Sequence, residues 1–126
     1  MDIYDIFDDF GDEPRRILMN AGVNVVIHPK GKRRPDSKEM IKILENFDGI
    51  IIGTSQKITE DMFENIVTPK IIATASVGID HIKVPEEKCS LVTIINTPKA
   101  NAKSVAEYTI GCALICYKRI FEGKQL

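Results

Sequence analysis

Short apolar runs, continuous rather than alternating, constrain the fold of this chain more than any other feature. The clearest spans residues 49–53, where three isoleucines lie between two glycines, and similar β-favouring runs occur at residues 2–7, 23–27, 71–75 and 91–95. Continuous apolar runs suit strands that are covered on both faces, and strands alternating with helical patterns are typical of parallel sheets. The sequence therefore predicts an α/β fold with about five parallel strands and helices on both faces.

Helical patterns lie between these runs. The first begins at residues 12–14, where two acidic residues precede a proline, and ends before Gly22. Asp36 is placed to cap a second helix, with Glu39 at the position that completes a capping box. Thr59 is expected to cap a third helix. Each of these helices carries apolar residues at helical spacing, so each has a face for the core.

The last helical segment, residues 105–121, is apolar nearly all round. With its two tyrosines counted among the apolar residues, its charged or hydroxylated residues are Glu107, Thr109, Lys118 and Arg119. A sheet of about five strands covers one side of such a helix, so we expect another domain or subunit against the remaining sides. The alternative is a central helix that is sandwiched within this one domain.

Two turns follow predicted strands, in residues 71–82 and 96–107. Gly78 is expected to free the backbone of the first turn, which would present bare amide groups. In the second, a turn at Pro98 leads to Asn101 as the expected N-cap of the last helix. Ligands of parallel sheets bind beyond the carboxyl ends of strands, and both features suit a small carboxylate or phosphate. In the alternative interpretation, Gly78 only turns the chain and Asn101 only caps a helix.

Length and charge restrict the function classes. A chain of 126 residues suits one compact domain, and a net charge of −1 gives no sign of nucleic-acid or membrane binding. No apolar run reaches membrane-spanning length and the N-terminus lacks a signal-peptide pattern, so we expect a cytoplasmic protein. Cys89, Cys112 and Cys116 are expected to be buried reduced thiols, and the sequence predicts no metal site.

Three ordered motifs carry a resemblance to a known family. They are Ala-Ser-Val-Gly-Ile-Asp-His-Ile at residues 75–82, Ile-Asn-Thr-Pro at residues 95–98 and Asn-Ala-Lys-Ser-Val-Ala-Glu at residues 101–107. Together they resemble the D-isomer-specific 2-hydroxyacid dehydrogenases, which include phosphoglycerate dehydrogenase and glyoxylate reductase. The resemblance implies a flavodoxin-like sheet and makes residues 1–126 a substrate-binding domain, with residues 104–121 as an interdomain helix. The nucleotide-binding domain of such an enzyme is absent, and no Gly-x-Gly-x-x-Gly occurs in the sequence.

The resemblance also implies a site for a small 2-hydroxy or 2-oxo acid. Its carboxylate would be held by the amides of Val77 and Gly78, with Ser76 adjacent. Asn101, Ser104 and Val105 would face the nicotinamide of NAD or NADP, although neither cofactor is expected to bind tightly to this chain alone.

The arginine, glutamate and histidine that catalyse the family's reaction lie in or beyond the nucleotide domain, so no catalytic residue is assigned here. His81 and His28 are interpreted as structural residues. In phosphoglycerate-type members an arginine is expected at the end of the third strand, where this chain has Gly53. This difference argues against phosphoglycerate and leaves a smaller acid, such as glyoxylate or hydroxypyruvate, open as the substrate.

Two functions are compatible with these observations. The first is the substrate-binding domain of an NAD(P)-dependent D-2-hydroxyacid dehydrogenase, inactive in isolation, with the missing nucleotide-binding domain or a second subunit against residues 105–121. The alternative is a free-standing truncated paralogue that acts as a small-anion-binding or self-associating interaction module.

Overall fold

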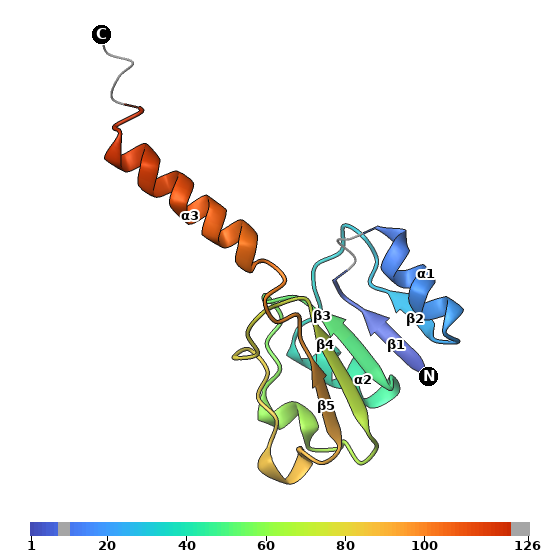
Figure 1. Ribbon diagram of the computed structural model, residues 1–126. Helices are drawn as coiled ribbons and strands as arrows, with labels where there is room; N and C mark the ends of the chain where they lie inside the picture. Colours follow the sequence, from blue (N-terminus) through green and yellow to red (C-terminus); the bar gives the residue numbers. More distant parts are fainter. Residues whose placement is uncertain (8–10, 122–126) are drawn as a thin grey trace.

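A five-stranded parallel sheet forms the body of the protein (Figure 1). The structure is a computed structural model that describes residues 1–7 and 11–121. The strands are β1 (Asp2–Asp5), β2 (Asn24–Ile27), β3 (Gly49–Ile52), β4 (Lys70–Thr74) and β5 (Val92–Ile95). Their spatial order is β2-β1-β3-β4-β5, with every neighbouring pair parallel. This order confirms the predicted flavodoxin-like α/β fold.

Helices pack on both faces of the sheet, as expected (Figure 1). The α-helices are α1 (Asp12–Asn20), α2 (Ser37–Asn46) and α3 (Ala102–Tyr117), and two single-turn 3₁₀ helices are η1 (Glu60–Phe63) and η2 (Glu86–Lys88). The helix α2 and η1 cover one face, where the fully buried side chains are Phe63, Leu44, Ile50, Ile52, Ile58, Ile66 and Ile72. Burial of each such side chain stabilises the fold by about 1.5–3 kcal/mol, so this face is the hydrophobic core.

The opposite face of the sheet is less well covered than the sequence predicts. Ile51, Ile71 and Ala73 point to this face and are only partly buried, whereas Ile50 and Ile52 on the core face are fully buried. The cause is α1, which lies beside β2 and has no buried residue. The continuous apolar run of β3 is thus covered on both faces but unequally.

The predicted capping box of α2 is confirmed. The Asp36 carboxylate accepts a hydrogen bond from the Glu39 amide at 3.0 Å, and the Glu39 carboxylate accepts one from the Asp36 amide at 2.9 Å. At the other end of the helix, the buried Lys70 ammonium donates to the carbonyl of Phe47 at 2.7 Å. At each end of α2, side chains therefore satisfy some of the backbone groups that have no partner within the helix.

The helix predicted after Thr59 is wrong in type and length. Only the single 3₁₀ turn η1 forms, and the Thr59 side chain makes no capping hydrogen bond. Ile58, directly before it, forms a parallel bridge with Ile82, and Pro69 leads directly into β4. The chain is therefore held at both ends of a short connection, and one tight turn is the geometry that fits.

The helix α3 extends away from the sheet, and none of its residues is buried (Figure 1). It ends at Tyr117 rather than Phe121. Arg119 adopts a φ of 48°, with its amide bonded to the Cys116 carbonyl and the Ile120 amide bonded to the Ile115 carbonyl. These two hydrogen bonds form a Schellman motif, which closes the helix without a glycine.

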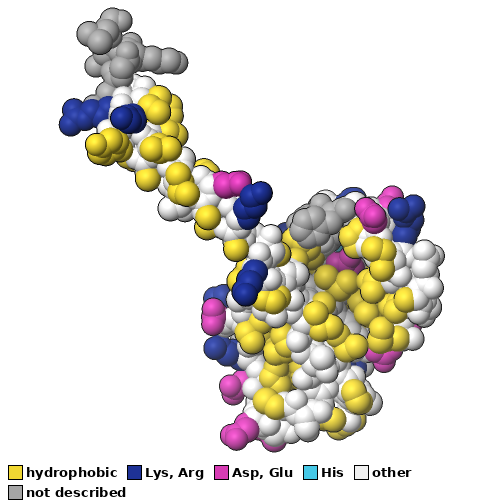
Figure 2. Space-filling view, viewed as in Figure 1, with side chains coloured by type: hydrophobic (Ala, Val, Ile, Leu, Met, Phe, Trp, Pro, Cys, Tyr) yellow, Lys and Arg dark blue, Asp and Glu magenta, His cyan; other side chains and the backbone are white. Residues whose placement is uncertain are grey.

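The exposure of α3 excludes the alternative of a helix sandwiched within its own domain. Apolar side chains are visible along its length (Figure 2), and they include Val105, Tyr108, Ile110, Leu114 and Tyr117. No helix among residues 1–7 and 11–121 is long and apolar enough to cross a membrane.

The expectation of buried cysteines is wrong. Cys112 and Cys116 lie on α3, where Cys112 is half-buried and Cys116 is exposed, and Cys89 is also exposed.

Candidate functional site

The turn that follows β4 borders a hollow at the carboxyl end of the sheet. The hollow has a volume of about 380 Å³, and its lining residues are Ala75, Ser76, Val77, Thr97, Ala100 and Asn101. They come from the segment after β4 and from the segment between β5 and α3. The structure thus brings together the two stretches that the sequence analysis placed at strand ends.

Hydrogen bonds from the protein hold all three carbonyl groups of the turn. The Ser76 carbonyl accepts from the Thr97 amide at 2.9 Å and from the Thr97 hydroxyl at 3.0 Å. The Val77 carbonyl accepts from Asn96 Nδ2 at 2.7 Å, and the Gly78 carbonyl accepts from Ser76 Oγ at 2.7 Å. The acceptors of the turn are therefore satisfied within the protein.

The amide groups of the same turn are not satisfied in this way. Within residues 1–7 and 11–121, the N–H groups of Val77 and Gly78 donate to no protein acceptor. Val77 is 46% exposed, so the turn lies at the surface. Successive free N–H groups create a positive local potential that binds anions. A carboxylate is the simplest small ligand that such a pair of donors fits.

Gly78 is not needed for backbone freedom, contrary to expectation. Its φ lies outside the left-handed region, and a Cβ at this position would meet only Asp80 Oδ2, at 3.4 Å. Neither backbone conformation nor packing therefore requires glycine here. The absence of a side chain instead leaves the approach to the amide open.

The residues expected to face a cofactor are only partly brought to the hollow. Asn101 lines it and occupies the N-cap position of α3, as predicted, although its side chain makes no capping hydrogen bond. Its φ of −109° and ψ of 6° differ from the extended conformation usual for a capping side chain. Ser104 and Val105 lie exposed on the first turn of α3 and do not line the hollow.

Sequence reasoning missed the structural use of Asn96 and Thr97. Both lie inside the Ile-Asn-Thr-Pro motif, and they bind carbonyls of the turn that lie 19 and 21 residues before them. The sequence signal that could have identified them is the position of two hydrogen-bonding side chains directly after a strand. Sequence spacing could not show which backbone groups they contact.

The two histidines have different surroundings. His81 Nε2 lies 3.0 Å from the hydroxyl of buried Thr74, beside the turn. His28 lies at the other edge of the sheet, where Nδ1 is 3.1 Å from the Tyr4 hydroxyl and Nε2 is 3.0 Å from the Arg33 carbonyl. Both histidines are hydrogen-bonded within the protein, which agrees with the structural interpretation, and His81 belongs to the network of the turn.

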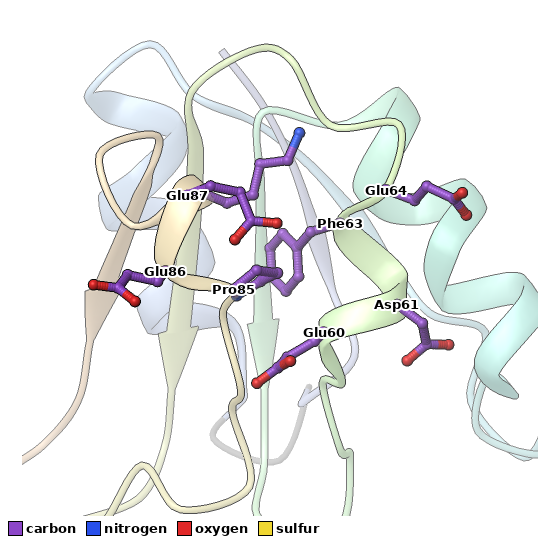
Figure 3. Close-up of a pocket in the computed structure, with 8 residues that line it drawn as sticks. Glu60, Asp61, Phe63, Glu64, Pro85, Glu86 and Glu87 are labelled. Atoms are coloured by element: carbon purple, nitrogen blue, oxygen red, sulfur yellow. The ribbon is translucent and has the colours of Figure 1, made fainter.

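A larger hollow lies elsewhere on the described part of the chain. It has a volume of about 840 Å³ and lies between η1 and η2, toward the amino ends of β4 and β5 (Figure 1). Its walls carry several carboxylates, and that of Glu86 points away from those of Asp61 and Glu64 (Figure 3). No group of three or more metal-binding side chains is found within residues 1–7 and 11–121. This acidic, open surface repels anions, whereas the hollow beside Val77 borders unpaired backbone N–H groups and is the candidate site.

Sequence comparisons identify relatives over nearly the whole chain. The family described as D-isomer specific 2-hydroxyacid dehydrogenase, catalytic domain, matches residues 5–120. A hydroxypyruvate reductase of Thermotoga maritima is 36% identical over 113 residues, which are 90% of this chain and 36% of that protein. A glyoxylate reductase of Thermofilum pendens is 28% identical over 114 residues, which are 90% of this chain and 34% of that protein. The chain thus spans about a third of the length of these curated relatives.

Solved structures share the fold. An acyclic imino acid reductase in complex with NADPH and D-Arg superposes with a TM-score of 0.79 at 21% identity, over 99% of this chain and 40% of that one. A 3-phosphoglycerate dehydrogenase of Entamoeba histolytica bound to NAD⁺ gives a TM-score of 0.66 at 30% identity, over 91% of this chain and 38% of that one. With the family match over residues 5–120, these similarities show that the chain belongs to the D-isomer-specific 2-hydroxyacid dehydrogenase family, in the part that corresponds to its catalytic domain.

Proposed function

We propose that this chain binds the carboxylate of a small 2-hydroxy or 2-oxo acid at the turn Ser76–Gly78, as the substrate-binding domain of an NAD(P)-dependent D-2-hydroxyacid dehydrogenase. The observation that carries the proposal is the contrast within this turn. Its carbonyls are all hydrogen-bonded by the protein, whereas the N–H groups of Val77 and Gly78 are left as donors beside the hollow. Donors without acceptors favour an anion.

The tail of the substrate is proposed to be small and uncharged. The end of β3 carries Gly53 in place of the arginine expected in phosphoglycerate-type relatives, and the ring of Phe7 packs against that glycine. An apolar ring at this position offers no charge to a phosphate group. Glyoxylate and hydroxypyruvate are therefore better candidates than phosphoglycerate.

The nicotinamide cofactor, NAD or NADP, is proposed to border this chain rather than be held by it. Asn101 lines the hollow, and Ser104 and Val105 are exposed on the adjacent turn of α3, so these residues are available to a nicotinamide ring. The sequence has no glycine-rich turn of the kind that binds a dinucleotide pyrophosphate. When bound, the cofactor supplies the hydride acceptor or donor of the family's reaction.

The acid–base and oxyanion chemistry of that reaction is proposed to come from residues outside this chain. His81 is hydrogen-bonded to Thr74, and none of its described contacts is a carboxylate that would prepare it for proton transfer. We therefore expect no NADH oxidation by the 126-residue protein with glyoxylate, hydroxypyruvate or pyruvate. Turnover by highly purified protein would contradict this assignment.

The proposed binding site is tested by amide-shift titration of ¹⁵N-labelled protein with glyoxylate. We expect the resonances of Val77 and Gly78 to move in a saturable way, while amides of the acidic hollow between η1 and η2 do not. Gly78→Ala is a matched variant, because the added methyl group would fit the fold and partly cover the amide. It should keep the native spectrum and weaken binding. If the Val77 and Gly78 resonances of the wild-type protein do not move, these residues are not the binding site.

A second function is favoured by the exposure of α3. Residues 105–121 present exposed apolar side chains, which suit either a nucleotide-binding domain or a second copy of a self-associating module. Sedimentation measurements distinguish these two possible partners of α3. A stable dimer that depends on α3 supports the free-standing module, whereas a monomer supports a domain that needs the rest of an enzyme.

A further inference from the structure

Three polar side chains and one backbone carbonyl form a continuous hydrogen-bonded chain behind the turn. His81 Nε2 lies 3.0 Å from Thr74 Oγ1, which lies 2.8 Å from Ser76 Oγ, and Ser76 Oγ lies 2.7 Å from the Gly78 carbonyl oxygen. Thr74 and Ser76 are 3% and 8% exposed, so the chain is shielded from water for most of its length. It begins at His81 and ends at the backbone of the proposed anion site.

Each hydroxyl has only one proton to donate, so all hydrogen bonds of this hydrogen-bonded chain run in the same direction. A carbonyl oxygen only accepts, so the single hydroxyl proton of Ser76 is donated to Gly78. Ser76 must then accept from Thr74, and the proton of Thr74 is used in turn. Thr74 therefore accepts from His81, which requires a proton on Nε2 of the imidazole ring. This tautomer is inferred from the network as a whole.

We propose that His81 is a positioning residue for the anion-binding turn, acting through the hydroxyls of Thr74 and Ser76. The hydrogen-bonded chain orients Ser76 Oγ toward the Gly78 carbonyl and so keeps this carbonyl pointing into the protein. The C=O and N–H groups of a trans peptide point in opposite directions, so the next amide, that of Ile79, is directed away from Ser76.

The consequence for binding follows from the adjacent contacts. Thr97 and Asn96 hold the carbonyls of Ser76 and Val77, and the His81 chain holds the third carbonyl of the same turn, that of Gly78. With all three carbonyls held, the turn does not need to reorganise when an anion arrives, and such preorganisation favours binding. The effect of His81 on affinity rests on the proposed function, whereas its effect on the turn does not.

The test uses the ¹⁵N-labelled 126-residue protein and compares His81→Met, which removes the donor, with His81→Gln, which keeps an N–H donor at a similar reach. Thr74→Val interrupts the chain at its second member while nearly preserving shape. His28→Met is the control, since His28 also makes two hydrogen bonds but lies at the far edge of the sheet. The readouts are the imidazole ¹⁵N shifts, the amide shifts of Gly78 and Ile79, and the Kd for glyoxylate.

We expect the wild-type ring of His81 to carry its proton on Nε2. His81→Met and Thr74→Val should move the Gly78 and Ile79 resonances and weaken glyoxylate binding about five-fold, the loss of one net hydrogen bond. His81→Gln and His28→Met should leave both properties near wild type. Should His81→Met fail to fold, Thr74→Val provides the same comparison.

A neutral ring protonated on Nδ1, or unchanged Gly78 and Ile79 resonances in His81→Met and Thr74→Val, would overturn the proposal. Equal glyoxylate affinity in all variants would also overturn it while leaving the proposed function intact. If glyoxylate binds no variant, including wild type, the proposed function fails, and the ligand-free tautomer and amide shifts still decide whether His81 positions the turn.

Discussion

The ring of Phe7 occupies the space that a side chain on Gly53 would need. A Cβ at residue 53 would lie 2.6 Å from Cδ2 and 2.9 Å from Cε2 of that ring, closer than real Cβ atoms approach other atoms. The ring thus takes the place where phosphoglycerate-type relatives are expected to have an arginine. This one contact joins the residue after β3 to the segment after β1, and it supports the proposal of a small acid whose tail carries no charge.

Gly53→Ala is expected to lower the free energy of unfolding by about 1–3 kcal/mol, because the ring must move. The double variant with Phe7→Ala should lose less than the sum of the two single variants, since the added methyl group then enters vacated space. Urea denaturation measures both. Gly111→Ala is the control, because nothing lies within 4 Å of its added Cβ, and it should cause no loss. Additive effects of Gly53→Ala and Phe7→Ala would contradict the contact.

Lys70→Met is expected to lower the free energy of unfolding by about 1–3 kcal/mol. Lys70 is 4% exposed and its ammonium donates to the Phe47 carbonyl at 2.7 Å, so the methionine would leave that carbonyl without its side-chain donor. Lys42→Met, on the exposed side of α2, should change stability far less. Equal effects of the two substitutions in urea denaturation would rule out a structural role for the ammonium.

The alkaline pH dependence of stability should also report on Lys70. Burial lowers its pKa below 10.5, an effect that Asp48 and Glu45 oppose. Just below pH 10.5 the unfolded chain therefore binds more protons than the folded one, and this group makes stability rise with pH. Burial raises the pKa of Tyr4 above 10.0, which acts in the opposite sense. Subtracting the free energy of unfolding of Lys70→Met from that of the wild type cancels the Tyr4 contribution. The remaining difference in free energy should vary with pH just below pH 10.5.

Asp36→Asn is expected to remove one acid-sensitive contribution to stability. The hydrogen bond from the Glu39 amide, together with the Arg33 guanidinium, holds the pKa of Asp36 below 3.8. Its contribution is therefore present above pH 3.8 and is lost as the pH falls through the lower folded-state value. Asparagine keeps the capping oxygen but does not titrate. Acid unfolding curves followed by circular dichroism should show a shallower dependence below pH 3.8 for the variant.

Polar substitutions on α3 should change association rather than stability. Ile110 and Leu114 are 61% and 52% exposed, so the double variant Ile110→Ser and Leu114→Ser should keep the free energy of unfolding within about 0.5 kcal/mol of wild type. Phe63→Ala, in the core, should lower it by about 3–5 kcal/mol. Sedimentation should show less self-association for the α3 variant only. A large loss of stability in that variant would mean that α3 packs against the sheet.

Local patterns predicted much of the fold. The five apolar runs correspond to the five strands, and Asp36 with Glu39 forms the capping box that their spacing predicts. Connection lengths were harder to predict. Thr59 begins one 3₁₀ turn instead of an α-helix, because the bridge between Ile58 and Ile82 holds the preceding residue in place. A pairing across 24 residues leaves no signal in a short window of sequence.

The sequence alone was enough for the class of fold, the family and the end of the sheet where the candidate site lies, because hydrophobic period and motif order are properties of neighbouring residues. Contacts between distant segments decided the rest: the ring of Phe7 against Gly53, the bonds from Asn96 and Thr97 to the turn, and the exposure of α3. Such contacts depend on how strands and loops meet in space. Chain folding therefore selects which of the polar groups at the strand ends are paired and which remain open to an anion.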